Sequence, residues 1–91
     1  MRIVVAGTGF VGLTHAAVLA ENGHEVFAYD IDLNKIAAYA SGDRARIEHY
    51  VNEPGLVEVI GETLGRYLFF VGPDGIDAAL EGVDAIFMAP P

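Results

Sequence analysis

Residues 7–12 constrain the fold of this chain more than any other segment, because they hold three glycines in a fixed spacing. They read G-T-G-F-V-G, which fits the pattern G-x-G-x-x-G, and they follow an apolar, β-branched run at residues 3–6. A helical pattern begins straight after them, with apolar residues at i, i+3, i+4 and i+7 counted from Leu13. A turn of this kind between a buried strand and a helix predicts a binding site for the pyrophosphate of a dinucleotide.

The three glycines have separate expected tasks. Gly7 permits the tight turn, Gly9 lets a pyrophosphate approach the backbone, and Gly12 lets the helix pack close to the strand. The free N–H groups at the start of the helix, at the positive end of its dipole, then face the phosphates. The alternative is a strand-to-helix turn that binds nothing. We favour binding because the strand and the helix that the motif requires are both predicted.

An acidic residue lies at the expected distance beyond this turn. Asp30 follows Gly12 by about 18 residues, at the end of a second predicted buried strand, where a carboxylate accepts hydrogen bonds from the adenosine ribose. It would repel a 2′-phosphate, and no arginine follows closely, so NAD is preferred over NADP. The alternative task, capping the next helix, suits Asp32 better. Lys35, the only lysine, lies one turn into that helix within reach of the adenosine; a solvated surface charge is the alternative.

Strands and helices alternate along the rest of the chain. We expect strands at residues 3–6, 26–29, 67–71 and 85–89, and helices at residues 10–22, 33–41, 54–64 and 74–81. The polar, irregular residues 43–52 are expected to form a loop. The residues expected to face inward are Leu33, Ile36, Ala37 and Ala40 in the second helix, and Ile76, Ala79 and Leu80 in the last.

This alternation predicts an α/β fold with right-handed crossovers between parallel strands. The class is a Rossmann-type doubly wound parallel sheet, of which the chain holds the first half, with strand order 3-2-1-4, truncated after the fourth strand. That strand is internal in a complete doubly wound sheet, so here its apolar edge would be bare. We therefore expect residues 1–91 to be the N-terminal part of a dinucleotide-binding domain, a fragment without the substrate and C-terminal domains. The bare strand makes a homo-oligomer possible.

Composition narrows the function further. Thirteen acidic and five basic residues give a net charge of −8, and no Lys/Arg cluster is present, which argues against nucleic-acid and anionic-membrane partners. The chain has no cysteine, so it carries no thiolate metal site and no cysteine nucleophile. No histidines share metal-ligand spacing, and no general base is convincing. The N-terminus does not read as a signal peptide, no apolar run reaches about 20 residues, and the cytoplasm is the expected location.

With these motifs placed, the chain resembles the N-terminal NAD-binding domain of the UDP-glucose/GDP-mannose dehydrogenase family. The matching stretches are residues 3–13, 23–26, 29–32, 35–36, 84–87 and the segment E-P-G-L at residues 53–56. Two departures are visible. Residues 43–52 are longer than usual in the family and place Asn52 where an aromatic is usual, and the family's Thr-Pro pair is replaced by Ala89-Pro90.

The resemblance implies oxidation of the C6 hydroxyl of a nucleotide sugar to a carboxylate in two NAD-dependent steps. UDP-glucose is the expected substrate of the full-length protein, with GDP-mannose and UDP-N-acetylmannosamine as alternatives within the family. A non-catalytic module that senses NAD(H) is the alternative from another class, because this fold serves many functions. The chain alone is expected to bind NAD and to turn over no sugar.

The predicted site follows from the motif and the resemblance together. The cofactor-binding residues are expected to be Gly7, Thr8, Gly9, Phe10, Val11, Gly12, Asp30, Lys35, Ala89 and Pro90. The last two are included because the resemblance places the segment after the fourth strand next to the cofactor. No catalytic residue and no metal ligand is predicted on this chain.

Overall fold

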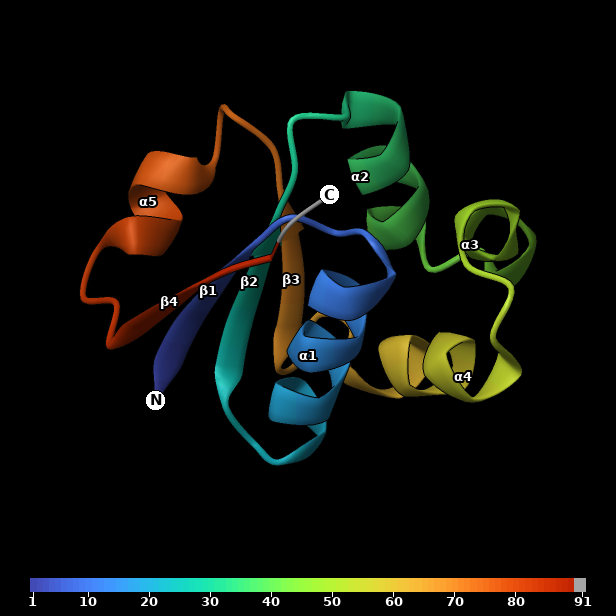
Figure 1. Ribbon diagram of the computed structural model, residues 1–91, viewed down its shortest axis with the longest axis horizontal. Helices are drawn as coiled ribbons and strands as arrows, with labels where there is room; N and C mark the ends of the chain where they lie inside the picture. Colours follow the sequence, from blue (N-terminus) through green and yellow to red (C-terminus); the bar gives the residue numbers. More distant parts are fainter. Residues whose placement is uncertain (90–91) are drawn as a thin grey trace.

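The computed structural model describes residues 1–89 and contains a four-stranded, all-parallel sheet (Figure 1). The strands are β1 (Arg2–Ala6), β2 (Glu25–Tyr29), β3 (Leu68–Val71) and β4 (Ala85–Met88), and they lie in the order β3-β2-β1-β4. Each neighbouring pair is parallel and in continuous register. The α/β class and the predicted order 3-2-1-4 are therefore confirmed.

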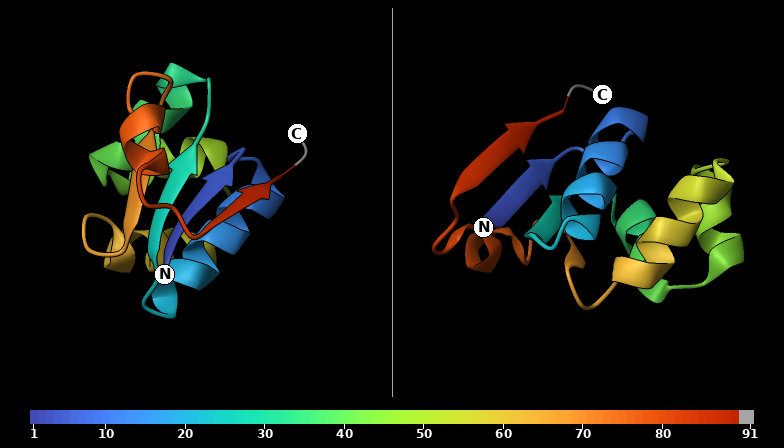
Figure 2. Two further views of the ribbon diagram at one scale, coloured as in Figure 1. Left: turned by 90° about the vertical axis from the view of Figure 1, so that its left-hand side faces the viewer. Right: turned by 90° about the horizontal axis from the view of Figure 1, so that it is seen from below.

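The helices cover the sheet unequally (Figure 2). The helices α1, α2, α3 and α4 lie on one face, and the short α5 lies on the other. Their bounds are α1 (Phe10–Glu21), α2 (Leu33–Ser41), α3 (Arg44–Tyr50), α4 (Pro54–Thr63) and α5 (Ile76–Leu80). None of the helices within residues 1–89 combines the length and the apolar character needed to cross a membrane.

The core lies between the central strands and α1. Val5 on β1 and Val26 on β2 are fully buried against Leu13 on α1. The predicted inner face of α1 continues with small buried residues, Ala16, Ala17 and Ala20, which allow the helix axis to approach the sheet closely. This packing fixes the start of α1 at the carboxyl end of β1.

The expectation that residues 43–52 form a loop is wrong, because α3 lies within them. Asp43 caps this helix, and its side chain accepts hydrogen bonds from the backbone N–H of Ala45 (2.9 Å) and Arg46 (3.4 Å). Ile47 is buried and anchors the helix to the core. An i, i+4 ion pair between Arg44 and Glu48, 3.5 Å apart, adds modest surface support.

The expected inner face of α2 is also partly wrong. Ile36 is buried as predicted, but Leu33 is 62% exposed, and Ala37 and Ala40 face solvent as well. Tyr39 is buried in their place, with its ring centroid 5.1 Å from that of Phe70 on β3. The large aromatic side chain buries more apolar area than the alanines, and this decides how the helix is rotated.

Smaller differences concern the end of the chain. Leu80 was expected to face inward but is exposed, because the five-residue α5 buries Ala79 against the rest of the molecule. On β4, three consecutive apolar side chains, Ile86, Phe87 and Met88, are exposed. Within residues 1–89, β4 pairs with β1 alone, so its outer edge is free, as the sequence predicted.

Candidate cofactor site

The turn after β1 is shaped by two glycines that leave no space for a side chain. Gly7 has a φ of +107°, and a Cβ atom there would lie 2.7 Å from the carbonyl oxygen of Ala89. A Cβ atom on Gly12 would lie 1.9 Å from the carbonyl oxygen of Gly7. By contrast, a Cβ atom on Gly9 would meet no atom within 4 Å. The backbone at Gly9 is therefore open to a ligand, while the turn on either side is tightly packed.

The start of α1 has no cap from a side chain. Gly9 is the N-cap residue, no side chain hydrogen-bonds to the first turn, and this turn holds no acidic residue. The N–H groups of a first helical turn have no partner within the helix, and together with the helix dipole they attract an anion. Phe10 and Val11 belong to this first turn, and their side chains are exposed. The turn fits a phosphate group.

Asp30 lies directly after β2, facing this turn. Its Oδ2 atom accepts hydrogen bonds from the backbone N–H (3.0 Å) and the hydroxyl (2.7 Å) of Thr8. Its Oδ1 atom accepts from the backbone N–H of Asp32 at 3.0 Å. The Nζ atom of Lys35 lies 3.8 Å from Oδ2. These contacts join the turn after β1 (residues 7–12, called the phosphate turn below) to the start of α2.

Partial burial raises the pKa of Asp30, but it is outweighed by stabilisation of the charged form. The backbone N–H of Asp32, the hydroxyl and N–H of Thr8 and the positive charge of Lys35 together hold this pKa below its ordinary value. The carboxylate is therefore ionised at neutral pH. It presents a fixed negative charge and hydrogen-bond acceptors beside the phosphate turn.

Two alternative roles, a helix cap for Asp30 and a solvated surface charge for Lys35, do not fit the geometry. Asp32 is the N-cap of α2, and its side chain accepts a hydrogen bond from the backbone N–H of Lys35 at 3.1 Å. Asp30 is therefore not needed as the cap of this helix. The Lys35 side chain is 24% exposed and lies toward the Asp30 carboxylate, so it is not a freely solvated surface charge.

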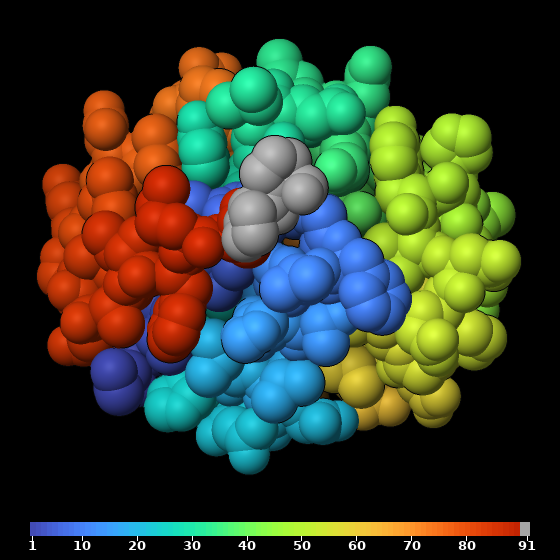
Figure 3. Space-filling model, in the orientation of Figure 1, coloured from blue at the N-terminus to red at the C-terminus, as the bar shows by residue number. Residues whose placement is uncertain are grey.

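A cleft of about 510 Å³ lies at the carboxyl ends of β1, β2 and β4. It is lined by Ala6, Gly7, Thr8, Gly9, Tyr29, Asp30, Ile31, Asp32, Lys35 and Ala89. The structure thus brings six of the predicted site residues together around one cleft, while Phe10, Val11 and Gly12 follow at the start of α1. Pro90 lies outside the described residues. Figure 3 shows α1 (lighter blue) on the molecular surface between β4 (red) and α3 and α4 (yellow-green).

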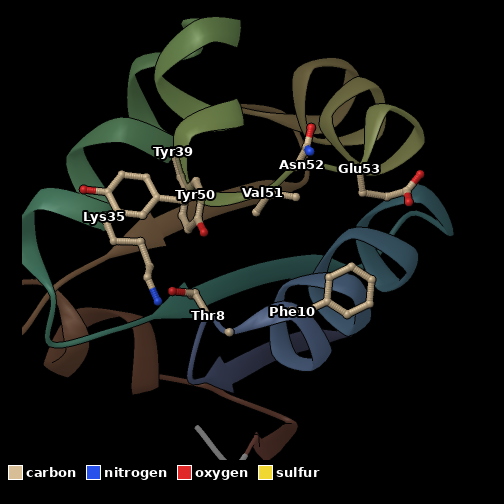
Figure 4. Close-up of a pocket in the computed structure, with 9 residues that line it drawn as sticks. Thr8, Phe10, Lys35, Tyr39, Tyr50, Val51, Asn52 and Glu53 are labelled. Atoms are coloured by element: carbon tan, nitrogen blue, oxygen red, sulfur yellow. The ribbon is translucent and has the colours of Figure 1, made fainter.

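A second hollow of about 200 Å³ adjoins the first on the side of α2 and α3 (Figure 4). It shares Thr8, Gly9 and Lys35 with the larger cleft, and Figure 4 shows the ammonium group of Lys35 directed toward Thr8. Sequence reasoning missed its other wall, which is formed by Tyr39, Tyr50, Val51, Asn52 and Glu53. The Asp43 cap was a signal for the helix α3, on which Tyr50 lies, but not for the place where α3 packs.

Tyr39 contributes a protonated phenol to this region. Burial raises its pKa to about 12, with smaller electrostatic contributions from Asp30, Tyr50 and Asp32. Its hydroxyl is therefore a hydrogen-bond donor at all physiological pH values. Within the described part of the chain, no three His, Cys, Asp or Glu side chains gather in a way that could hold a metal ion.

The residues present fit a dinucleotide. An anion can approach the open backbone at Gly9, and the Asp30 carboxylate lies beside it to accept hydrogen bonds from hydroxyl groups. The cleft opens at the carboxyl ends of the strands, where ligands bind in open α/β sheets. Its volume lies within the usual range for small-molecule sites.

Comparisons with known proteins agree with this geometry. Residues 1–91 match the model of the UDP-glucose/GDP-mannose dehydrogenase family, NAD binding domain. UDP-glucose 6-dehydrogenase AglM of Haloferax volcanii is 35% identical over 91 residues, which are 100% of this chain and 19% of that protein. UDP-glucose 6-dehydrogenase YwqF of Bacillus subtilis is 36% identical over 91 residues, covering 98% of this chain and 19% of that protein.

A shorter match extends to a related activity. UDP-N-acetyl-D-mannosamine dehydrogenase of Methanococcus vannielii is 34% identical over 59 residues, covering 65% of this chain and 13% of that protein. The chain thus spans about a fifth of the length of the first curated relatives that it matches. Because the family match covers every residue, the chain belongs to the UDP-glucose/GDP-mannose dehydrogenase family and corresponds to its NAD-binding domain.

Proposed function

We propose that this chain is the NAD-binding part of a dehydrogenase that oxidises UDP-glucose to UDP-glucuronate in two NAD-dependent steps. The observation that supports NAD binding is the ionised Asp30 carboxylate, held beside the open backbone of Gly9 at the carboxyl end of the sheet, and the family match over residues 1–91 supports the dehydrogenase. In this proposal, residues 1–91 are the N-terminal part of the dinucleotide-binding domain. The parts that read the sugar lie elsewhere in a longer protein, in line with the length of the relatives.

When bound, NAD supplies the hydride acceptor, and this chain supplies binding and orientation. The N–H groups at the start of α1 receive the pyrophosphate, and Asp30 accepts a hydrogen bond from a hydroxyl of the adenosine ribose. The same carboxylate repels a 2′-phosphate, so NADP is disfavoured. Ala89, packed against Gly7 at the rim of the cleft, lies on the side toward β4.

The names of the relatives support the choice of substrate. Both relatives described above that match along nearly the whole chain are named UDP-glucose 6-dehydrogenase, and a shorter match is named for UDP-N-acetyl-D-mannosamine. UDP-glucose is therefore our first choice, and UDP-N-acetylmannosamine and GDP-mannose are the substrates to compare with it. We place the protein in the cytoplasm, where the cell's NAD pool is available, and fractionation of the source cells tests this.

The test of this function is NADH formation by the longest open reading frame that contains this chain. We expect NADH with UDP-glucose and none with the 91-residue chain alone. An Asp30→Ala variant is expected to raise the KM for NAD at least about tenfold and to leave the KM for UDP-glucose unchanged, because the ribose contact is lost. Asp43→Ala, which removes a helix-capping carboxylate in α3, is the matched control.

If the longer protein forms no NADH with any of the three nucleotide sugars, the proposed activity is contradicted. If the chain still binds NAD in that case, a non-catalytic NAD(H)-sensing module replaces it. NADH formation by the 91 residues alone would contradict the division of labour that we propose.

A further inference from the structure

Thr8 is a polar residue in a place where the glycine motif requires no particular side chain. It is 1% exposed, and its hydroxyl reaches across 22 residues of sequence to Asp30. The other buried threonine, Thr63, differs from it, because its hydroxyl donates to Val59 of its own helix at 2.7 Å. The Thr8 hydroxyl therefore makes a long-range hydrogen bond that a role within its own secondary-structure element does not explain.

The contacts of Asp30 show what this side chain does. A carboxylate has about four lone-pair sites for hydrogen bonds. Thr8 fills two on Oδ2 with its N–H and its hydroxyl, and the N–H of Asp32 fills one on Oδ1. Both oxygens are thus held by hydrogen bonds, and the remaining acceptor site lies on Oδ1. The hydroxyl bond, at 2.7 Å, is the shortest of the three.

We propose that Thr8 is a positioning residue that sets the choice between NAD and NADP by holding Asp30 in its ribose-accepting orientation. This inference rests on the proposed function, because it assumes that the cleft takes a dinucleotide. Thr8 acts through Asp30: its buried hydroxyl points at the carboxylate, and its backbone forms part of the phosphate turn.

Lys35 explains why the orientation of Asp30 controls specificity. Its ammonium group lies 3.8 Å from the Asp30 Oδ2 atom, so the carboxylate occupies the position where an anion would meet this lysine. If Asp30 turned away, Lys35 would be free to pair with a 2′-phosphate. Holding the carboxylate in place therefore strengthens the ribose contact and blocks the phosphate contact at the same time.

The remaining charged and titratable groups around Asp30 come from α2. They are Lys35, Asp32 at the N-cap and the phenol of Tyr39. Thr8, on the turn after β1, is the uncharged contact, and it meets the same Oδ2 atom of Asp30 as Lys35 does. Removal of its hydroxyl leaves all three groups in place, so the variant isolates one hydrogen bond.

The experiment compares Thr8→Val, which keeps the branched shape and loses the hydroxyl, with Thr8→Ser, which keeps the hydroxyl. Calorimetric titration of each variant with NAD and with NADP gives the ratio of the two affinities. We expect Thr8→Val to lower the NAD preference about tenfold, the scale of one hydrogen bond to a charged group, and Thr8→Ser to retain it. Thr63→Val removes a buried hydroxyl far from the site and is expected to change nothing in this ratio. If Thr8→Val does not fold, Thr8→Ala takes its place.

A double-mutant cycle separates positioning from a general effect on folding. In an Asp30→Ala background, Thr8→Val is expected to leave NAD affinity within about twofold, because the group it positions is gone. An equal loss of NAD affinity in both backgrounds would overturn the proposal. So would an unchanged NAD preference in a folded Thr8→Val protein.

NMR titration of the Asp30 carboxyl without any cofactor keeps this inference distinct from the proposed function. The Thr8 hydroxyl bond stabilises the charged form, so Thr8→Val is expected to raise the pKa of Asp30. An unchanged pKa would overturn the positioning role even if NAD binds. If wild-type protein does not bind NAD, the proposed function fails, and the role of Thr8 in specificity fails with it, whatever the pKa shows.

Discussion

At the scale of single residues, the three glycines of the phosphate turn are not equivalent. Gly7 and Gly12 are packed so closely that a Cβ atom on either would approach a backbone oxygen within 2.7 Å, whereas Gly9 faces open space. Gly7 and Gly12 therefore close the turn, and Gly9 leaves room for a ligand. Substitution of Gly12 should therefore impair folding, whereas substitution of Gly9 should impair ligand binding.

We predict that Gly12→Ala destabilises the protein by about 3 kcal/mol, because its Cβ atom would lie 1.9 Å from the carbonyl oxygen of Gly7. Gly9→Ala is expected to change the free energy of unfolding by less than about 1 kcal/mol and to weaken NAD binding about tenfold. Urea unfolding and calorimetry on the two variants measure both quantities. Equal stability of the two variants would contradict the packing described here.

The charge of Asp30 makes a second prediction at this scale. Its pKa is lowered in the folded protein, so the ionised carboxylate contributes stability that is fully present above the ordinary aspartate pKa of about 3.9. This contribution is lost as the pH falls through the lower, folded value. We expect wild-type protein to be more stable than Asp30→Asn at neutral pH, with a difference that shrinks below about pH 4. A difference that stays constant with pH, measured by urea unfolding, would contradict this.

At the scale of secondary-structure elements, the sequence predicted the alternation of strands and helices but missed α3. Hydrophobic periodicity identifies helices with several inward residues, such as α1, whereas α3 buries Ile47 alone. The capping residue Asp43 was the remaining signal, and the mixed charges around it also suited a loop. The rotation of α2 could not be predicted either, because Tyr39 is oriented by Phe70, which is distant in sequence.

The contacts of α3 predict which substitutions destabilise it. Ile47→Ala is expected to destabilise the protein by about 2–4 kcal/mol, as for other buried large-to-small changes, and Asp43→Ala by about 1 kcal/mol through loss of the cap. Arg44→Ala, which removes an exposed ion pair, should change stability by less than about 0.5 kcal/mol. Urea unfolding ranks the three variants, and a loop at these positions would make all three effects small.

At the scale of the whole molecule, the fold gathers a site from segments that are far apart in sequence. The turn after β1 and the acid after β2 could be predicted together, because the glycine motif defines both positions. The wall formed by Tyr50, Asn52 and Glu53 could not, since its place depends on how α3 and α4 pack against α1 and α2. Long-range packing of this kind leaves no short-range pattern in the sequence.

The free edge of β4 belongs to this scale as well. Ile86, Phe87 and Met88 are exposed on a strand that pairs with β1 alone within residues 1–89, and exposed apolar edges pair with other chains. We predict that the chain self-associates and that Ile86→Lys reduces this, as measured by sedimentation velocity. Val18→Lys, at a similarly exposed apolar position on α1, is the control and should leave association unchanged. A wild-type chain that stays monomeric at high concentration would contradict the prediction.

The most direct test of the NAD site is calorimetric titration of the protein with NAD and with NADP, alongside Asp30→Ala. We predict saturable NAD binding, NADP binding at least about tenfold weaker, and a loss of NAD affinity of about tenfold or more in the variant, the scale of one hydrogen bond to a charged group. Asp43→Ala should bind NAD as the wild type does. NAD binding that is unchanged by Asp30→Ala in a folded protein, or a preference for NADP, would contradict the assignment of the cleft between β1, β2 and β4 as the NAD site.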